Sequence, residues 1–107
     1  MKAMNDWKEI SIGQTFEKLE TEDVLIVDIR DEDSYEASHI PDSIHLNREN
    51  SKKFMDTADK TIPVIVYCYH GNSSQSAASY LISEGFKEVY SMAGGFESWK
   101  LSYPCEP

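Results

Sequence analysis

Residues 63–86 decide the fold, and they read PVIVYCYHGNSSQSAASYLISEGF. The segment Val64–Tyr67 is apolar and mostly β-branched with no polar alternation, which predicts a strand buried on both faces, as in a parallel sheet. A helix is predicted from about Ser74 to Ser83, and Gly85 can end it in the left-handed conformation. The apolar stripe of this helix consists of Ala77, Ala78, Leu81 and Ile82. The stretch is therefore a buried strand, a polar loop and a helix in direct succession.

The rest of the chain alternates short apolar runs with amphipathic stretches, which is the pattern of βαβ units. A second strong strand is predicted at residues 24–27. Weaker strands are predicted at residues 9–11, 44–46 and 88–91, so the sheet has five strands. Helices are predicted at residues 12–19, 31–38 and about 50–58, with Tyr35 as the core anchor of the second helix. These features predict one α/β domain over residues 1–107.

Length and composition limit the classes of function. A chain of 107 residues with 40% hydrophobic and 11% aromatic residues supports one compact core. Ten Lys and Arg against 19 Asp and Glu give a net charge of −9, which argues against nucleic acid as a partner. Residues 1–10 contain no apolar stretch, so we expect no signal peptide, no membrane association and a cytoplasmic location. Two cysteines are too few for a disulfide framework, and a reducing compartment would keep both as thiols.

Cys68 stands where the strand meets the loop, and parallel α/β sheets bind their ligands at this end of their strands. The residues that follow are small, polar or turn-forming, and Gly71 can take a positive φ, so backbone amides can point inward and form an anion-binding nest. The start of the next helix adds further amides and a partial positive charge, which favour a thiolate. Cys68 is therefore a candidate nucleophile; the alternative interpretation is a small hydrophobic residue that ends a strand.

Several polar residues near this loop have both a functional and a structural interpretation. Asp28 and Arg30 end the other strong strand, and we favour a structural role in which Asp28 accepts loop amides and Arg30 braces the next turn. His70 is expected to face solvent, because a loop whose amides point inward directs its side chains outward. His39 and His45 are expected to brace turns, since the histidines and cysteines lack metal-ligand spacing and no metal is expected.

The C-terminal residues also allow two interpretations. Gly94 and Gly95 permit a tight turn, and Phe96 and Trp99 form an apolar pair on a short helix. Both aromatic residues are expected to lie in the core; the alternative is that they line one wall of the site around Cys68. Cys105 lies in a Pro-flanked tail and is expected to be an incidental exposed thiol, with a resolving cysteine as the alternative.

Four motifs together resemble the rhodanese sulfurtransferases over nearly the whole chain. They are Val27-Asp28-Ile29-Arg30, Ser38-His39-Ile40-Pro41-Asp42-Ser43, Cys68-Tyr69-His70-Gly71-Asn72-Ser73 and Gly94-Gly95-Phe96-Glu97-Ser98-Trp99. In length and loop sequence the chain is most similar to the bacterial single-domain members of the family. The resemblance implies a rhodanese-like fold, in which a five-stranded parallel sheet has helices on both faces. It also implies a ping-pong reaction through a persulfide on Cys68.

The resemblance further implies thiosulfate as sulfur donor and cyanide or a thiol, such as that of thioredoxin, as acceptor, with no cofactor. The substrate would be held by the backbone amides of Tyr69, His70, Gly71, Asn72, Ser73 and Ser74. Two features depart from the wider family. Ser38, Asp42 and Ser43 stand where many members have Gly, Gly and Ala. The loop also has no Arg or Lys, which predicts modest affinity for thiosulfate.

Two other functions use a similar cysteine loop. Cysteine phosphatases and arsenate reductases need an Arg six residues after the cysteine, and that position is Ser74 here. Rhodanese-like phosphatases also have a loop one residue longer. The second alternative is an adaptor that carries a persulfide and delivers sulfur to a partner protein. The sequence leaves the acceptor and the oligomeric state open.

Overall fold

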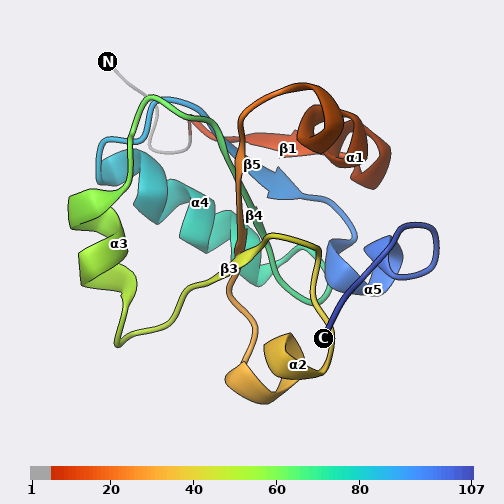
Figure 1. The fold of residues 1–107 in the computed structure, drawn as a ribbon. Helices are drawn as coiled ribbons and strands as arrows, with labels where there is room; N and C mark the ends of the chain where they lie inside the picture. Colours follow the sequence, from red (N-terminus) through yellow and green to blue (C-terminus); the bar gives the residue numbers. More distant parts are fainter. Residues whose placement is uncertain (1–5) are drawn as a thin grey trace.

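The computed structural model describes residues 6–107, which form a five-stranded parallel sheet flanked by helices (Figure 1). The strands are β1 (Lys8–Ile10), β2 (Leu25–Asp28), β3 (Ile44–His45), β4 (Val64–Tyr67) and β5 (Val89–Met92). The helices are α1 (Ile12–Thr21), α2 (Glu32–Ala37), α3 (Ser51–Thr57), α4 (Ser73–Ser83) and α5 (Gly95–Trp99). The strand order is β1-β5-β4-β2-β3, and every neighbouring pair is parallel. The predicted α/β class is confirmed.

For most of the helices and strands, the predicted boundaries differ from the observed ones by one or two residues. The expectations about residues 1–10 and about a domain spanning 1–107 include residues 1–5, which lie outside the described part of the chain. Within residues 6–107, no helix is long and apolar enough to cross a membrane.

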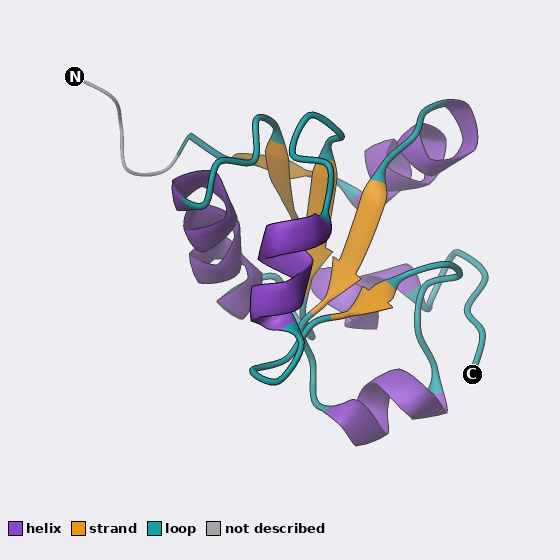
Figure 2. Cartoon of the chain, turned by 60° about the vertical axis from the view of Figure 1, so that its left-hand side comes forward, coloured by secondary structure: helices purple, strands orange, loops and turns teal. Residues whose placement is uncertain are grey.

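The sheet is covered on both faces, as predicted. α3 and α4 lie on one side, and α1 and α5 lie on the other (Figures 1 and 2). All four residues of β4 are fully buried, and they alternate between the two layers: Ile65 and Tyr67 belong to the core beneath α1 and α5, and Val64 and Val66 to the core beneath α3 and α4. Each such aliphatic side chain contributes about 1.5–3 kcal/mol by leaving water. Burial on both faces explains why this strand has no polar alternation.

Local hydrogen bonds set the ends of the longer helices. Ser11 begins α1 with a capping box, in which its hydroxyl accepts from the Gln14 amide and the Gln14 side chain accepts from the Ser11 amide. α4 begins at Ser73, one residue earlier than predicted. It ends before Gly85, which has a φ of 104° and donates its amide hydrogen bond to the Ile82 carbonyl. Both features match the prediction that Gly85 ends the helix in the left-handed conformation.

The prediction that Tyr35 anchors α2 in the core is wrong. α2 buries none of its residues and lies past the carboxyl ends of the strands (Figures 1 and 2), so it has no sheet face to cover. Tyr35 is half-buried, stacks between the rings of His39 (4.0 Å between ring centroids) and His45 (4.8 Å), and donates its hydroxyl to the Ser43 carbonyl. The two histidines therefore brace this segment, as predicted, and their ring nitrogens hydrogen-bond to the carbonyls of Tyr35 and Arg30.

The prediction that Cys105, in the Pro-flanked tail, is an exposed thiol is also wrong. Cys105 is half-buried against the core beneath α1 and α5. The tail is held by two backbone hydrogen bonds between His39 and Glu106, at 2.8 and 2.9 Å, and by the Trp99 indole, which donates to the Pro104 carbonyl. The two bonds to His39 are long-range, so they give the Pro-rich tail a fixed path that local sequence does not encode.

Candidate active site

The loop between β4 and α4 wraps around the sulfur of Cys68. The Gly71 and Ser74 amides donate to Sγ at 3.2 and 3.3 Å, and the Ser74 hydroxyl lies 3.5 Å from it. Gly71 has a φ of 95°, so the predicted left-handed turn is present. Cys68 is only 5% exposed, so the surrounding protein covers almost the whole residue.

Two opposing influences act on the pKa of Cys68. Burial raises it, but hydrogen bonds from the Ser74 hydroxyl and from the amides of Ser74, Gly71 and His70 together lower it below that of an ordinary thiol. Tyr69, Asn72 and Ser73, also predicted to offer amides, make no hydrogen bond to the sulfur within the described chain. A short loop can aim only some of its amides at one atom.

The start of α5 holds the loop from the other side. The amides of Phe96 and Glu97 donate to the carbonyls of Cys68 and Tyr69 at 2.8 and 3.0 Å. Gly95, with a φ of 60°, leaves no room for a side chain, because a Cβ there would stand 2.6 Å from the Cys68 carbonyl oxygen. Sequence reasoning assigned the Gly94-Gly95 pair only to a turn; paired glycines just before a short helix are the signal for this close approach.

Two serine hydroxyls behind the sulfur were also missed. Ser74 was predicted only for its amide, yet its hydroxyl lies between Cys68 Sγ and the Ser91 hydroxyl, 2.7 Å from the latter. Ser74 is fully buried and Ser91 is 1% exposed. The available signal was Ser91, whose hydroxyl is a lone small polar group at the end of the strand predicted at residues 88–91.

Arg30 lies near the loop, with its guanidinium carbon 5.7 Å from the Tyr69 ring centroid, and its charge is paired with Asp28. The guanidinium donates three hydrogen bonds to the Asp28 carboxylate and one, of 2.7 Å, to the Ser38 carbonyl, and its centre lies 4.1 Å from the Phe96 ring centroid. Burial lowers the pKa of Arg30, but the bonds and the charge of Asp28 outweigh burial and raise it overall. The Arg30 amide also donates to Asp28 at 2.8 Å. Both residues thus hold the turn after β2 together.

The outer side of the loop is tied to α2. Tyr69, 38% exposed, donates its hydroxyl to Asp31 and hydrogen-bonds to the Ser34 hydroxyl. These contacts, that of Tyr69 foremost, lower the pKa of Asp31 to about 2. His70 is exposed, as the sequence predicted.

The rim of the loop carries charges of both signs. Lys100 forms a 2.7 Å ion pair with Glu97. The pKa of Glu97 is lowered chiefly by this hydrogen bond, with smaller contributions from the charges of His70 and Arg30. Of Lys100, His70 and Arg30, His70 alone belongs to the loop itself.

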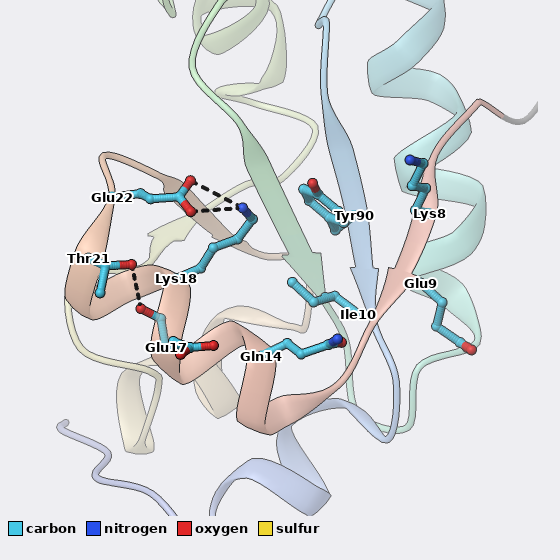
Figure 3. A pocket seen from close by; sticks show the side chains of 9 residues that line it. All are labelled: Lys8, Glu9, Ile10, Gln14, Glu17, Lys18, Thr21, Glu22 and Tyr90. Carbon is cyan, nitrogen blue, oxygen red and sulfur yellow. Dashed lines mark hydrogen bonds and ion pairs between the residues drawn. The ribbon is translucent and has the colours of Figure 1, made fainter.

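A cavity elsewhere is unrelated to Cys68. It measures about 380 Å³ and lies between α1 and the β1 edge of the sheet, with charges of both signs on its walls (Figure 3). None of the residues that line it belongs to the Cys68 loop. Over residues 6–107, no cluster of three or more His, Cys, Asp or Glu is arranged to hold a metal ion.

Comparisons with known proteins agree with this arrangement. Residues 13–102 match the rhodanese-like domain family. The chain is 49% identical over 98 residues to the thiosulfate sulfurtransferase GlpE of Coxiella burnetii, an alignment covering 92% of each chain. It is 54% identical over 97 residues to the protein of the same name in Pseudoalteromonas translucida, covering 91% of this chain and 92% of that one. The solved rhodanese-like domain of an Anabaena protein matches in fold, with a TM-score of 0.82 at 24% identity over 92% of this chain and 77% of that one.

Proposed function

The chain belongs to the rhodanese-like family and is a thiosulfate sulfurtransferase, and we propose that it carries the transferred sulfur as a persulfide on Cys68. The observation that supports this most directly is the Cys68 sulfur, which receives two backbone hydrogen bonds and lies beside a hydroxyl at the start of α4. This environment stabilises negative charge on sulfur.

The first half-reaction is a displacement at sulfur. The Cys68 thiolate attacks the outer sulfur of thiosulfate, a new sulfur–sulfur bond forms, the bond within thiosulfate breaks, and sulfite leaves with the electron pair. One negative charge remains on the terminal sulfur of the persulfide. In the second half-reaction an acceptor anion takes that sulfur and the thiolate is regenerated, which gives ping-pong kinetics.

The loop contributes by stabilising charge rather than by moving protons. The amides of Gly71 and Ser74 are already aimed at Sγ, so they need no reorganisation as charge moves during the displacement. The hydrogen bonds from α5 to the Cys68 and Tyr69 carbonyls hold the loop in this shape. The loop amides that make no hydrogen bond to the sulfur, at Tyr69, Asn72 and Ser73, would bind the incoming anion together with the amides already aimed at Sγ.

The proposed acceptors are cyanide and thiols, including a protein thiol such as that of thioredoxin. Both classes attack the terminal sulfur as anions and leave Cys68 as a thiolate. An adaptor that delivers sulfur to a partner protein would use the same persulfide, so the two functions differ only in the acceptor. We place the protein in the cytoplasm, where a reducing environment keeps Cys68 and Cys105 as thiols.

Phosphatase chemistry is not favoured. Ser74 occupies the position where those enzymes need Arg, and it is fully buried with its hydroxyl between Cys68 and Ser91. We expect no hydrolysis of aryl phosphates, and a rate that disappears in Cys68→Ser would contradict this assignment.

Mass spectrometry of the intact protein tests the proposal. After incubation with thiosulfate, the wild type should gain one sulfur, about 32 Da, as covalent catalysis requires. Cys68→Ser should gain none and should lose sulfur transfer while remaining folded. Cys105→Ser is the matched control, because it removes the other thiol and should still gain the sulfur. A wild type that stays unmodified, or a modification that maps to Cys105, would overturn the mechanism.

A further inference from the structure

Three buried atoms lie in a row behind the active-site loop: Cys68 Sγ, Ser74 Oγ and Ser91 Oγ. The contacts between them measure 3.5 Å and 2.7 Å. Ser74 comes from the first turn of α4 and Ser91 from β5, so the row crosses from a helix to the sheet. Within the described chain, neither hydroxyl has another hydrogen-bond partner.

We propose that Ser91 is a positioning residue for the sulfur-transfer reaction: its hydroxyl donates to Ser74 Oγ and thereby orients the Ser74 proton toward Cys68 Sγ. Ser91 does not touch the sulfur and acts only through Ser74. The inference rests on the proposed role of Cys68 and extends it to a residue on a different element of the fold.

A count of protons gives the reason. Three atoms in a row have two contacts between them, and each contact takes one proton. In the thiolate state the two hydroxyl protons fill both contacts, from Ser91 to Ser74 and from Ser74 to sulfur. In the thiol state there are three protons for the same two contacts, so one donor is left without an acceptor. The pair of serines therefore favours the thiolate over the thiol.

Burial makes this preference effective. Ser74 is fully buried and Ser91 is 1% exposed, so water does not compete for either hydroxyl. Hydrogen bonds are electrostatically stronger in such surroundings, and a donor to Ser74 polarises the bond that Ser74 makes. Without Ser91, the Ser74 hydroxyl would lose this polarising donor and the contact that fixes its orientation.

The register of the sheet puts Ser91 in this place. Val89 belongs to the core beneath α4, and Met92 to the core on the opposite face. Alternation along β5 therefore turns Ser91 toward α4, where Ser74 stands. β5 also lies directly beside β4, which ends at Tyr67, the residue before the cysteine.

The test follows the ionisation of Cys68, which is independent of sulfur transfer. The rate of iodoacetamide labelling at Cys68 is measured against pH, with peptide mass spectrometry to separate it from Cys105. Ser91→Ala should raise the midpoint by about half a pH unit, so that labelling below the midpoint slows about threefold. The pH profile of kcat/KM for thiosulfate should shift with it.

Matched variants separate positioning from packing. Thr and Val have the same shape, so Ser91→Thr should keep the wild-type midpoint and Ser91→Val should raise it, even if Ser91→Ala folds poorly. Ser43→Ala removes another buried hydroxyl, one that contacts Tyr67, and should leave the midpoint unchanged.

A double-mutant cycle tests the route through Ser74. In a Ser74→Ala background, Ser91→Ala should cause no further shift. An unchanged midpoint in both Ser91→Ala and Ser91→Val, or a full additional shift in the Ser74→Ala background, would overturn the inference. Either result would leave the persulfide on Cys68 untouched, because the mass measurement decides that separately.

Discussion

Cys68 is buried and yet surrounded by hydrogen-bond donors from its own loop, and these two conditions have opposite effects on its pKa. The donors prevail because the Ser74 hydroxyl and the amides of Ser74, Gly71 and His70 act together on one atom. Arg30, although cationic, contributes little to the loop because Asp28 neutralises it. At this scale the reactivity of the sulfur depends on backbone geometry more than on charged side chains.

The pH dependence of the first half-reaction follows from this lowered pKa. Only the thiolate attacks thiosulfate, so kcat/KM should rise with pH to a plateau, and the midpoint of the rise should lie below the pKa of an ordinary thiol. Stopped-flow or steady-state rates over a pH series would measure the midpoint. Ser74→Ala, which removes one donor and keeps the rest of the loop, should move the midpoint upward. A wild-type midpoint at or above the ordinary thiol value would mean that burial outweighs the donors.

Elements meet at the active site through glycines, where backbone packs directly on backbone. Gly95 at the start of α5 lies against the carbonyls of Cys68 and Tyr69. Gly71 similarly approaches the Gly94 amide, since a Cβ on Gly71 would stand 2.9 Å from that nitrogen. The shape of the loop therefore depends on α5, a helix distant in sequence from the cysteine.

Gly95→Ala should displace the loop and lower kcat/KM by roughly 100-fold, the order of loss expected when a reacting group moves by about 1 Å. Gly85→Ala is the matched control. Gly85 also has a positive φ, but a Cβ there would meet only the flexible Lys60 side chain at 3.3 Å. The control should lose about 1 kcal/mol of unfolding free energy and keep its kcat/KM. Equal kinetic losses in both variants would contradict this role for Gly95.

Asp42 is the one described residue other than glycine with a positive φ, at 68°. It is exposed, and it stands where many rhodaneses have glycine. Asp42→Gly should relieve the backbone and raise the unfolding free energy by about 0.5 kcal/mol, after the entropy cost of glycine is subtracted. Asp42→Ala keeps a Cβ and should be less stable than the wild type. Urea unfolding would measure the order, and an Ala variant as stable as the Gly variant would show that the turn is unstrained.

The molecule as a whole is strongly acidic, whereas its substrate is a dianion. The net charge is −9, and the loop has no Arg or Lys between Cys68 and Ser74. Mobile ions screen exposed charges beyond about 8 Å at physiological ionic strength, so short-range amides dominate at the sulfur. Long-range steering does not assist thiosulfate.

Added salt should therefore change kcat/KM only slightly or increase it, because salt screens repulsion rather than attraction. The KM for thiosulfate should be high, because the loop has no Arg or Lys to bind the dianion. His70→Arg should lower the KM, since residue 70 is exposed on the loop. Thr21→Arg is the control: it adds the same charge on α1, beside the cavity of Figure 3 and away from the loop. A steep fall of activity with salt, together with a micromolar KM, would show that Arg30 contacts the substrate after all.

The sequence by itself determined the strand, loop and helix around Cys68. A continuous apolar run predicts a strand buried on both faces, and Gly85 marks the end of the helix because glycine readily adopts the positive φ that ends many helices. Both signals depend on residues a few positions apart, so they survive without knowledge of the rest of the fold. The same is true of the five-strand α/β class, the α1 helix and the exposed position of His70.

Only the tertiary structure decided which distant residues meet. The Ser74 and Ser91 hydroxyls are 17 residues apart, and Tyr69 is 38 residues from Asp31. Their contacts depend on the strand order, which puts β4 between β5 and β2, and local patterns of hydrophobicity do not specify that order. The predictions for Tyr35 and Cys105 failed for the same reason. Tyr35 lies outside the core and Cys105 packs against it, because burial depends on what the rest of the folded chain places against a side chain.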